Sequence, residues 1–188
     1  KWVDGMSLGF IRWVQMYGEF AKTNNDYFPV FDGLFRKNDK YGLTSDSLET
    51  ERDQGAGIFG RWVWQDAKAE IYGELNYNDA KYNLRDLILD TGHARAYTIG
   101  IHKVFQKTPT SKIYEFSWER TLMQQTSSRL LRDAASWYMH GNVRHGYTNN
   151  GEVLGAGIGP GSNSQYFEFA LVDKLDKYSI AFEVIDQD

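Results

Sequence analysis

The chain has 188 residues, enough for one domain and too few for two of ordinary size. Its 21 Lys and Arg against 25 Asp and Glu leave no basic excess, which argues against a nucleic-acid partner. It has no cysteine, and this excludes disulfides, thiolate metal sites and cysteine nucleophiles.

Alternation of polar and apolar side chains with a period of two predicts about seven β-strands. In the segment 112–121, for example, the aromatic residues Tyr114, Phe116 and Trp118 alternate with polar ones. The alternation is weaker in the first strand, where it blurs over residues 11–14. In chain order the expected strands are 6–17, 55–65, 68–77, 95–106, 112–121, 164–172 and 177–185.

The connections between these strands alternate in length. Those at 65–67, 107–111 and 173–176 are short. Those at 18–54, 78–94 and 122–161 are long, and the spacing within 27–36 and 82–89 is compatible with one short helix each. The three prolines, Pro29, Pro109 and Pro160, all fall in connections, as expected if the rest is hydrogen-bonded strand.

Strand length and loop asymmetry together predict the fold class. The strands are about ten residues long, as a tilted membrane strand requires, and short turns at one end with long loops at the other are typical of a transmembrane barrel. No apolar run approaches the roughly 18 residues of a membrane helix. We therefore expect residues 1–188 to form one segment of an antiparallel, up-and-down, all-β transmembrane barrel with long extracellular loops.

Tryptophan and tyrosine make up much of the aromatic content of 15%, and many fall toward the expected strand ends. In a membrane barrel such residues form girdles at the two interfaces. The alternative is the ordinary aromatic core of a soluble β-sandwich. The residues expected in girdles are Trp13, Trp62, Trp64, Trp118, Tyr17, Tyr77, Tyr97, Tyr114 and Tyr178.

Charged residues on the polar sides of the strands are expected to line a barrel lumen. Those predicted there are Glu70, Glu74, Arg95, Glu115, Glu119 and Glu168. We expect the glutamates to pair with basic residues, and the arginines to make any contact with an acidic polysaccharide. Candidate partners are Arg61, Arg85, Arg95, Arg120 and Arg144. The alternative is a pair of carboxylates that hydrolyses a glycosidic bond, for which Glu115 and Glu119 are candidates.

The segment 137–149 gathers aromatic, cationic and amide side chains in one expected outer loop. Rings can stack on the apolar faces of sugars, while Arg, His and Asn can hydrogen-bond to hydroxyls. The alternative is a loop that folds into the lumen, with its aromatic side chains packed on one another; both can hold at once. The candidate glycan-binding residues are Trp137, Tyr138, His140, Arg144, His145, Tyr147 and Asn149.

Two patterns that suggest cofactors have simpler explanations. The glycine-rich stretch 155–161 is followed by an expected strand and contains Pro160, whereas a nucleotide-binding loop precedes a helix. We interpret it as a tight turn that needs positive φ. His140 and His145 fall on opposite faces of any strand and have no carboxylate motif beside them. No metal and no other cofactor is expected.

Several blocks together resemble the capsule assembly (Wzi) family of outer-membrane proteins, in the form common among Bacteroidetes. No single block is diagnostic, but their order and spacing fit, and they span most of the chain after residue 55. The blocks are AEIYGE at 69–74, NLRD at 83–86, HARAYTIG at 93–100, HGNVRHGYTNNG at 140–151 and LGAGIGPGSNSQ at 154–165.

The resemblance implies a large barrel in the bacterial outer membrane that binds capsular or related surface polysaccharide without catalysing a reaction. Members of the family are much longer, so this chain would correspond to the C-terminal part of such a barrel. No secretory signal pattern begins at Lys1, as expected of a mature segment or a piece of a longer chain. A soluble β-sandwich glycoside hydrolase or lectin module, and a porin-like channel, remain the alternatives.

Overall fold

The computed structural model describes residues 3–18, 52–78, 94–108, 112–124, 136–139 and 143–187. Seven long strands form one sheet: β1 (Met6–Met16), β2 (Arg52–Trp64), β3 (Ala69–Asn78), β4 (Arg95–Phe105), β5 (Ile113–Leu122), β8 (Asn163–Asp173) and β9 (Asp176–Asp186). A separate small hairpin consists of β6 (Thr148–Asn149) and β7 (Glu152–Val153).

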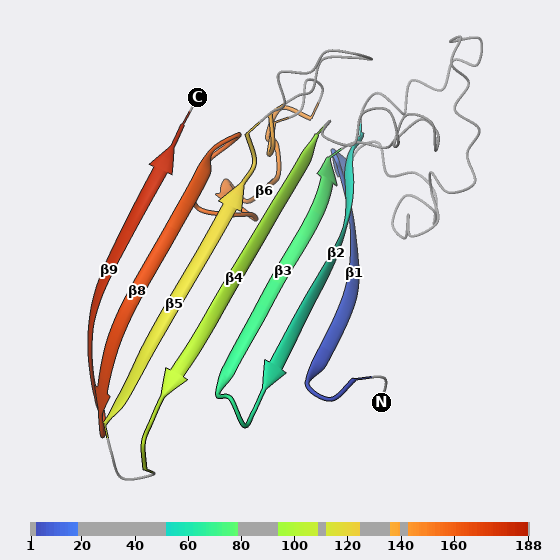
Figure 1. Ribbon diagram of the computed structural model, residues 1–188. Helices are drawn as coiled ribbons and strands as arrows, with labels where there is room; N and C mark the ends of the chain where they lie inside the picture. The colour runs from blue at the N-terminus through green and yellow to red at the C-terminus, as the bar shows by residue number, and fades with distance from the viewer. Residues whose placement is uncertain are drawn as a thin grey trace, which may run out of the picture.

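The sheet is an up-and-down meander with the order β1-β2-β3-β4-β5-β8-β9, and every pairing is antiparallel (Figure 1). This confirms the all-β, antiparallel class and the seven predicted strands. Within the described ranges the sheet is open, with β1 and β9 at its edges. These ranges contain no helix long and apolar enough to cross a bilayer. The two short helices expected at 27–36 and 82–89 lie outside the described residues.

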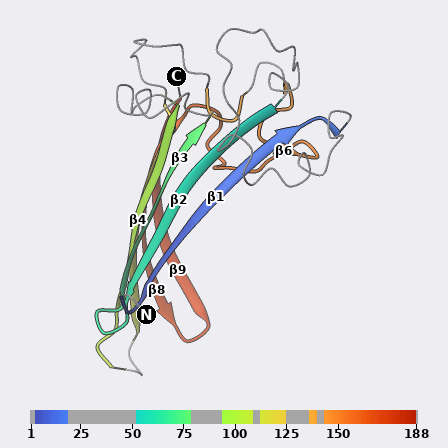
Figure 2. The same cartoon turned by 90° about the vertical axis from the view of Figure 1, so that its right-hand side faces the viewer.

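The two ends of the sheet differ, as the connection lengths predicted. The short connections β2–β3, β4–β5 and β8–β9 lie at one end, and β6 and the glycine-rich segment after it lie at the other (Figures 1 and 2). Figure 2 also shows that the sheet is curved. We call these the turn end and the loop end.

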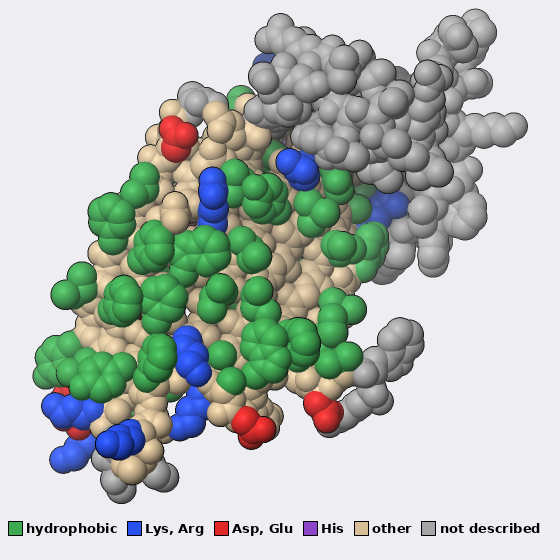
Figure 3. Space-filling view, viewed as in Figure 1, with side chains coloured by type: hydrophobic (Ala, Val, Ile, Leu, Met, Phe, Trp, Pro, Cys, Tyr) green, Lys and Arg blue, Asp and Glu red, His purple; other side chains and the backbone are tan. Residues whose placement is uncertain are grey.

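Register divides the sheet into two chemically distinct faces. One row of directly paired residues crosses all seven strands and is apolar throughout: Met6, Trp62, Ile71, Ile101, Trp118, Phe167 and Phe182. Side chains two residues away along each strand lie on the same side, because strand side chains alternate. We call this side the apolar face. Figure 3 shows hydrophobic side chains spread across it, with charged side chains gathered toward the two ends.

No described residue covers the apolar face. On the edge strand β9, Ile180 is 81% exposed, and Leu8 of β1 at the opposite edge is 75% exposed. Every strand residue that is buried lies on the other side of the sheet, which we call the polar face. The described hydrophobic core is a small cluster of Ala96, Met123 and Trp137 at the loop end of the polar face. The sheet is therefore not one layer of a sandwich within the described residues.

Candidate functional site

The polar face carries the glutamates that were predicted to share one side of the sheet. Register places Glu70, Glu74, Glu115, Glu119 and Glu168 together on it. Arg95, which was predicted with them, lies on the apolar face instead. It pairs with Tyr77, and its guanidinium lies 5.6 Å from the ring centroid of Tyr97. That part of the prediction is wrong, because Arg95 is odd-numbered like the apolar residues of its own strand, and alternate residues of a strand lie on the same face.

Ion pairs neutralise much of this acidic face. Arg61 binds Glu70 through its guanidinium, as the predicted Arg–Glu pairing required. Lys177, which we did not single out from the sequence, lies 3.4 Å from both Glu115 and Glu168. Lys177 and Glu183 are both odd-numbered residues of one strand and so lie on the same face, which was the signal in the sequence that Lys177 belongs to the polar face. Because both contact Lys177, Glu115 and Glu168 are ion-paired and do not form a free pair of carboxylates.

Arg120 was another predicted partner for the glutamates, and register places it on the apolar face with Ile99 and Gln165. The positions of Arg95 and Arg120 leave Arg61 as the only one of the five candidate arginines on the polar face of the described strands. Arg85 lies outside the described residues. The prediction is therefore confirmed for Arg61 and wrong for Arg95 and Arg120.

A tyrosine bridges two strands of the polar face across a glycine. Tyr72 on β3 pairs directly with Gly100 on β4, which pairs with Glu119 on β5. The Tyr72 hydroxyl donates a hydrogen bond of 2.6 Å to the Glu119 carboxylate. A Cβ atom on Gly100 would lie 2.2 Å from the Tyr72 ring, so glycine is required for this ring position. The bridge orients Glu119 without neutralising its charge.

The aromatic residues of the predicted outer loop pack over the loop end of the polar face. Tyr138 and Tyr147 stack with centroids 5.7 Å apart and an interplanar angle of 17°. Tyr147 also contacts Trp13 of β1 at 4.8 Å, and Trp137 meets Tyr138 edge-on. We call Trp13, Trp137, Tyr138 and Tyr147 the loop cluster. The mutual packing that the sequence left as an alternative is therefore present.

Backbone geometry fixes Tyr138 in this cluster. It has a φ of 66°, and its hydroxyl accepts a 2.8 Å hydrogen bond from the backbone N–H of Ala156. A Cβ atom on Gly155 would lie 2.2 Å from the ring, so the glycine-rich segment supplies a surface on which the ring can lie. Burial raises the pKa of the hydroxyls of Tyr138 and Tyr147 above the ordinary value of tyrosine.

The other predicted loop residues lie around the cluster. Asn149 is exposed in β6, whose hairpin turns at Asn150 and Gly151, both with positive φ. His145 lies edge-on to Tyr17 at 4.9 Å, and the backbone N–H of Arg144 donates to the Tyr17 hydroxyl. His140 lies outside the described residues.

The glycine-rich segment forms the turn that its sequence predicted. Gly159 and Gly161, on either side of Pro160, have φ values of 92° and 64°. The structure thus confirms positive φ at this turn, and no helix follows it before β8 begins. In the described parts of the chain, no group of three histidine or acidic side chains is placed to hold a metal ion.

The girdle prediction needs correction at two residues. Trp13 and Tyr17 belong to the polar face and contact the loop, so they do not face outward at a strand end. The other seven lie on the apolar face. Trp62, Trp64, Tyr114 and Tyr178 lie toward the turn end, Tyr77 and Tyr97 lie toward the loop end, and Trp118 lies near the middle of β5.

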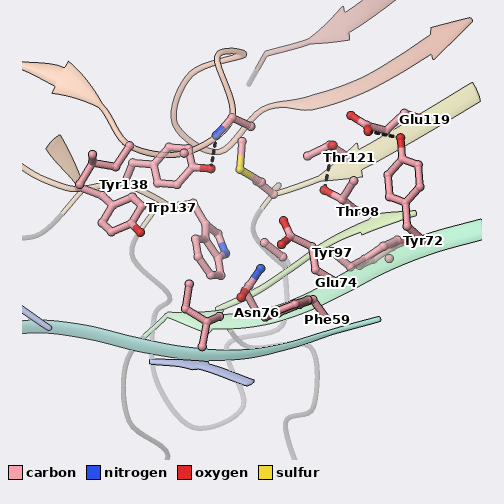
Figure 4. Close-up of a pocket in the computed structure, with 18 of the residues that line it drawn as sticks. Phe59, Tyr72, Glu74, Asn76, Tyr97, Thr98, Glu119, Thr121, Trp137 and Tyr138 are labelled. Atoms are coloured by element: carbon pink, nitrogen blue, oxygen red, sulfur yellow. Dashed lines mark hydrogen bonds between the residues drawn. The ribbon is translucent and has the colours of Figure 1, made fainter. Parts of the chain in front are cut away.

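A pocket of about 650 Å³ lies between the loop cluster and the polar face of β1 to β5 (Figure 4). Its aromatic lining includes Phe59 and Tyr72 as well as the four rings of the loop cluster. Its polar lining comes mainly from Arg61, Glu74, Asn76, Thr98, Glu119 and Thr121. Rings beside carboxylates, an amide and hydroxyls can hold a sugar, whose faces are apolar and whose edges are polar.

Three polar groups that line this pocket have no hydrogen bond to another described residue: the Glu74 carboxylate, the Asn76 amide and the Trp137 indole N–H. Figure 4 shows Glu74 and Asn76 pointing into the pocket, with the Trp137 nitrogen on the side toward them. Thr98 and Thr121, by contrast, bond to each other at 3.0 Å. The sequence assigned Glu74 to the lumen side and left open whether the loop with Trp137 folds onto that side; the structure brings both to one pocket.

Comparison with known proteins identified no relative: no family model, no curated protein and no solved structure matches the chain.

Proposed function

We propose that this chain is a segment of an outer-membrane β-barrel, and that it binds a surface polysaccharide in the pocket on its polar face without catalysing a reaction. The observation that carries the proposal is the apolar row from Met6 to Phe182. It crosses every strand of the sheet, and no described residue covers it. Soluble monomers rarely expose a contiguous apolar patch larger than a few hundred Å².

The height of the apolar face supports a bilayer as its partner. On β5 it extends from Tyr114 to Leu122, interrupted by Arg120 near the loop end, a rise of roughly 27 Å along the strand at about 3.4 Å per residue. At the usual tilt of about 35–45° this gives a height of about 20 Å, close to the roughly 25 Å apolar band of membrane barrels. Lys103 and Lys112 toward the turn end, and Arg12 and Arg95 toward the loop end, lie where lipid headgroups would be.

Polysaccharide binding is supported by the pocket and by the resemblance of the sequence to the capsule assembly family. The pocket combines seven aromatic residues with polar groups that have no hydrogen bond to another described residue. Glu115 and Glu168 are both ion-paired with Lys177, so these carboxylates are poorly suited to hydrolyse a glycosidic bond, and this favours binding over catalysis. No observation specifically favours the soluble hydrolase or the porin-like channel.

The proposal is tested by fractionation and glycan binding together. The chain is expected to need detergent, to sediment with outer membranes, and to retain surface polysaccharide of the producing cell on an affinity column. Tyr147→Ala removes a ring that contacts both Trp13 and Tyr138, and should lower the polysaccharide affinity by roughly ten-fold. Tyr178→Ala, a matched tyrosine on the apolar face at the turn end, should leave it unchanged.

Three results would contradict the proposal. A detergent-free, monomeric, soluble chain would remove the membrane assignment. Sugar hydrolysis that is lost in Glu119→Gln would establish an enzyme. Ion conductance in planar bilayers with no polysaccharide retention would favour the porin-like channel.

A further inference from the structure

The pocket presents donors and an acceptor at defined places, and none has a described protein partner. Trp137 is 4% exposed, and its indole N–H is a buried donor without a hydrogen bond. Such groups are uncommon in folded proteins and call for a partner. Glu74 and Asn76 lie two residues apart on β3, so both side chains lie on the same face.

Asn76 is held so that one end of its amide remains available. A Cβ atom on Gly57, its direct partner on β2, would lie 1.8 Å from the amide oxygen, which therefore occupies the space over the glycine. The amide nitrogen is left on the pocket side (Figure 4). Two N–H donors, from Asn76 and Trp137, thus lie near one carboxylate acceptor, Glu74.

We propose that the pocket binds a 2-acetamido sugar residue of the polysaccharide; this rests on the proposed function. The acetamido N–H donates to the Glu74 carboxylate, and the acetamido carbonyl accepts from the Trp137 N–H and the Asn76 amide. Its methyl group contacts the apolar patch of Ala96, Met123 and Ala156, which line the same pocket. The group thus satisfies both kinds of unpartnered side chain and fills an apolar recess.

The charge of the pocket argues against an acidic sugar. Among the described lining residues Arg61 is the one cation, and its guanidinium is bound by Glu70. Glu74 and Glu119 leave the pocket negative, and Tyr72 donates to Glu119 without changing its charge. A uronate carboxylate placed beside Glu74 would be repelled, and like charges brought together in a binding site disfavour the wrong partner.

The ligand class can be tested with four trisaccharides, three of which share one β-1,4-linked backbone, on the full chain in lipid nanodiscs by isothermal titration calorimetry. The probes are N,N′,N″-triacetylchitotriose, cellotriose, chitosan trimer and trigalacturonate. The first two differ only in having an acetamido group or a hydroxyl at C2. We expect triacetylchitotriose to bind at least ten-fold more tightly than cellotriose, and trigalacturonate to bind most weakly.

Three variants assign the contacts. Trp137→Phe keeps a ring but removes the N–H, and should weaken triacetylchitotriose about ten-fold while changing cellotriose little. Glu74→Gln removes the charge, and should strengthen trigalacturonate relative to triacetylchitotriose. Glu183→Gln is the control, because Glu183 pairs with Tyr166 on the polar face outside the pocket, and it should change neither affinity.

Each other outcome overturns the inference in a recognisable way. Equal affinity for triacetylchitotriose and cellotriose, tighter binding of trigalacturonate, or a preference for the free-amine chitosan trimer would exclude acetamido recognition and leave polysaccharide binding in place. If none of the four trisaccharides and no surface polysaccharide binds, both the inference and the proposed function fail.

Discussion

At the scale of single residues, glycines decide where the large side chains of the polar face can lie. Tyr72 lies over Gly100, Phe59 over Gly9 and Trp13 over Gly55, each on its direct cross-strand partner. In each pair a Cβ atom would lie within 2.4 Å of the ring. A ring that lies flat over a glycine leaves room beside the strand, and this is what keeps the pocket open.

Gly100→Ala should therefore displace the Tyr72 ring and break its hydrogen bond to Glu119. We expect a loss of about 1–3 kcal/mol in the free energy of unfolding, since overpacking forces side chains off their preferred positions. Urea denaturation of the chain refolded in detergent measures it. Gly157→Ala is the control because no atom lies within 4 Å of its Cβ position, and it should cost less than about 0.5 kcal/mol. Equal losses in the two variants would show that the ring position is not constrained by Gly100.

Parity along a strand explains which residue assignments could be made from the sequence. The glutamates were correctly predicted to share one face, because each occupies the polar side of the alternation in its strand. Arg95 was misplaced: it is odd-numbered like Ile99 and Ile101 of the same strand, so it lies on the apolar face with them in spite of its charge. Trp13 was also misplaced: Met6, Leu8 and Phe10 put the even-numbered residues of that strand on the apolar face, so Trp13 falls on the polar face.

At the scale of elements, the strands were predictable and the packing of the loop was not. The alternation located both ends of β1, β3, β4, β5, β8 and β9 to within one residue. The start of β2 was missed by three residues, because Arg52, Asp53 and Gln54 have the composition of a loop. The contact between Trp13 and Tyr147 joins residues 134 positions apart, and no local pattern encodes it.

The segment after Val143 is held to the sheet by contacts with β1. Tyr147 packs on Trp13, Gln15 donates a 2.8 Å hydrogen bond to the carbonyl of Thr148, and Tyr17 accepts from the N–H of Arg144. Trp13 is one of the residues over which the alternation of β1 blurs: it is an apolar side chain on the polar face, and the loop packs on it.

Tyr147→Ala should release this segment while the sheet remains folded. The loss of two aromatic contacts, worth about 1–3 kcal/mol together, should increase local opening by roughly ten-fold or more. Arg144 is exposed within the segment, so trypsin cleavage after it, followed by mass spectrometry, reports the opening. Tyr178→Ala, at the turn end of the other face, should not change the rate. If both variants are cleaved alike, the loop cluster does not hold the loop.

At the scale of the whole molecule, the sheet separates two environments. The apolar face has no described cover, and the polar face carries ion pairs, a tyrosine bridge and the pocket. A lipid bilayer on one side and a hydrated glycan on the other would satisfy both faces at once. The central claim of this account is therefore that the apolar side chains contact acyl chains.

The most direct measurement uses β9, where the two faces alternate residue by residue and the chain has no native cysteine. Single cysteines at 179 to 184, labelled with a fluorophore, are reconstituted into vesicles that contain brominated lipids. We predict strong quenching at Ile180, Phe182 and Val184 and little at Ser179, Ala181 and Glu183. Uniform weak quenching at all six positions, or quenching that does not alternate, would contradict the account.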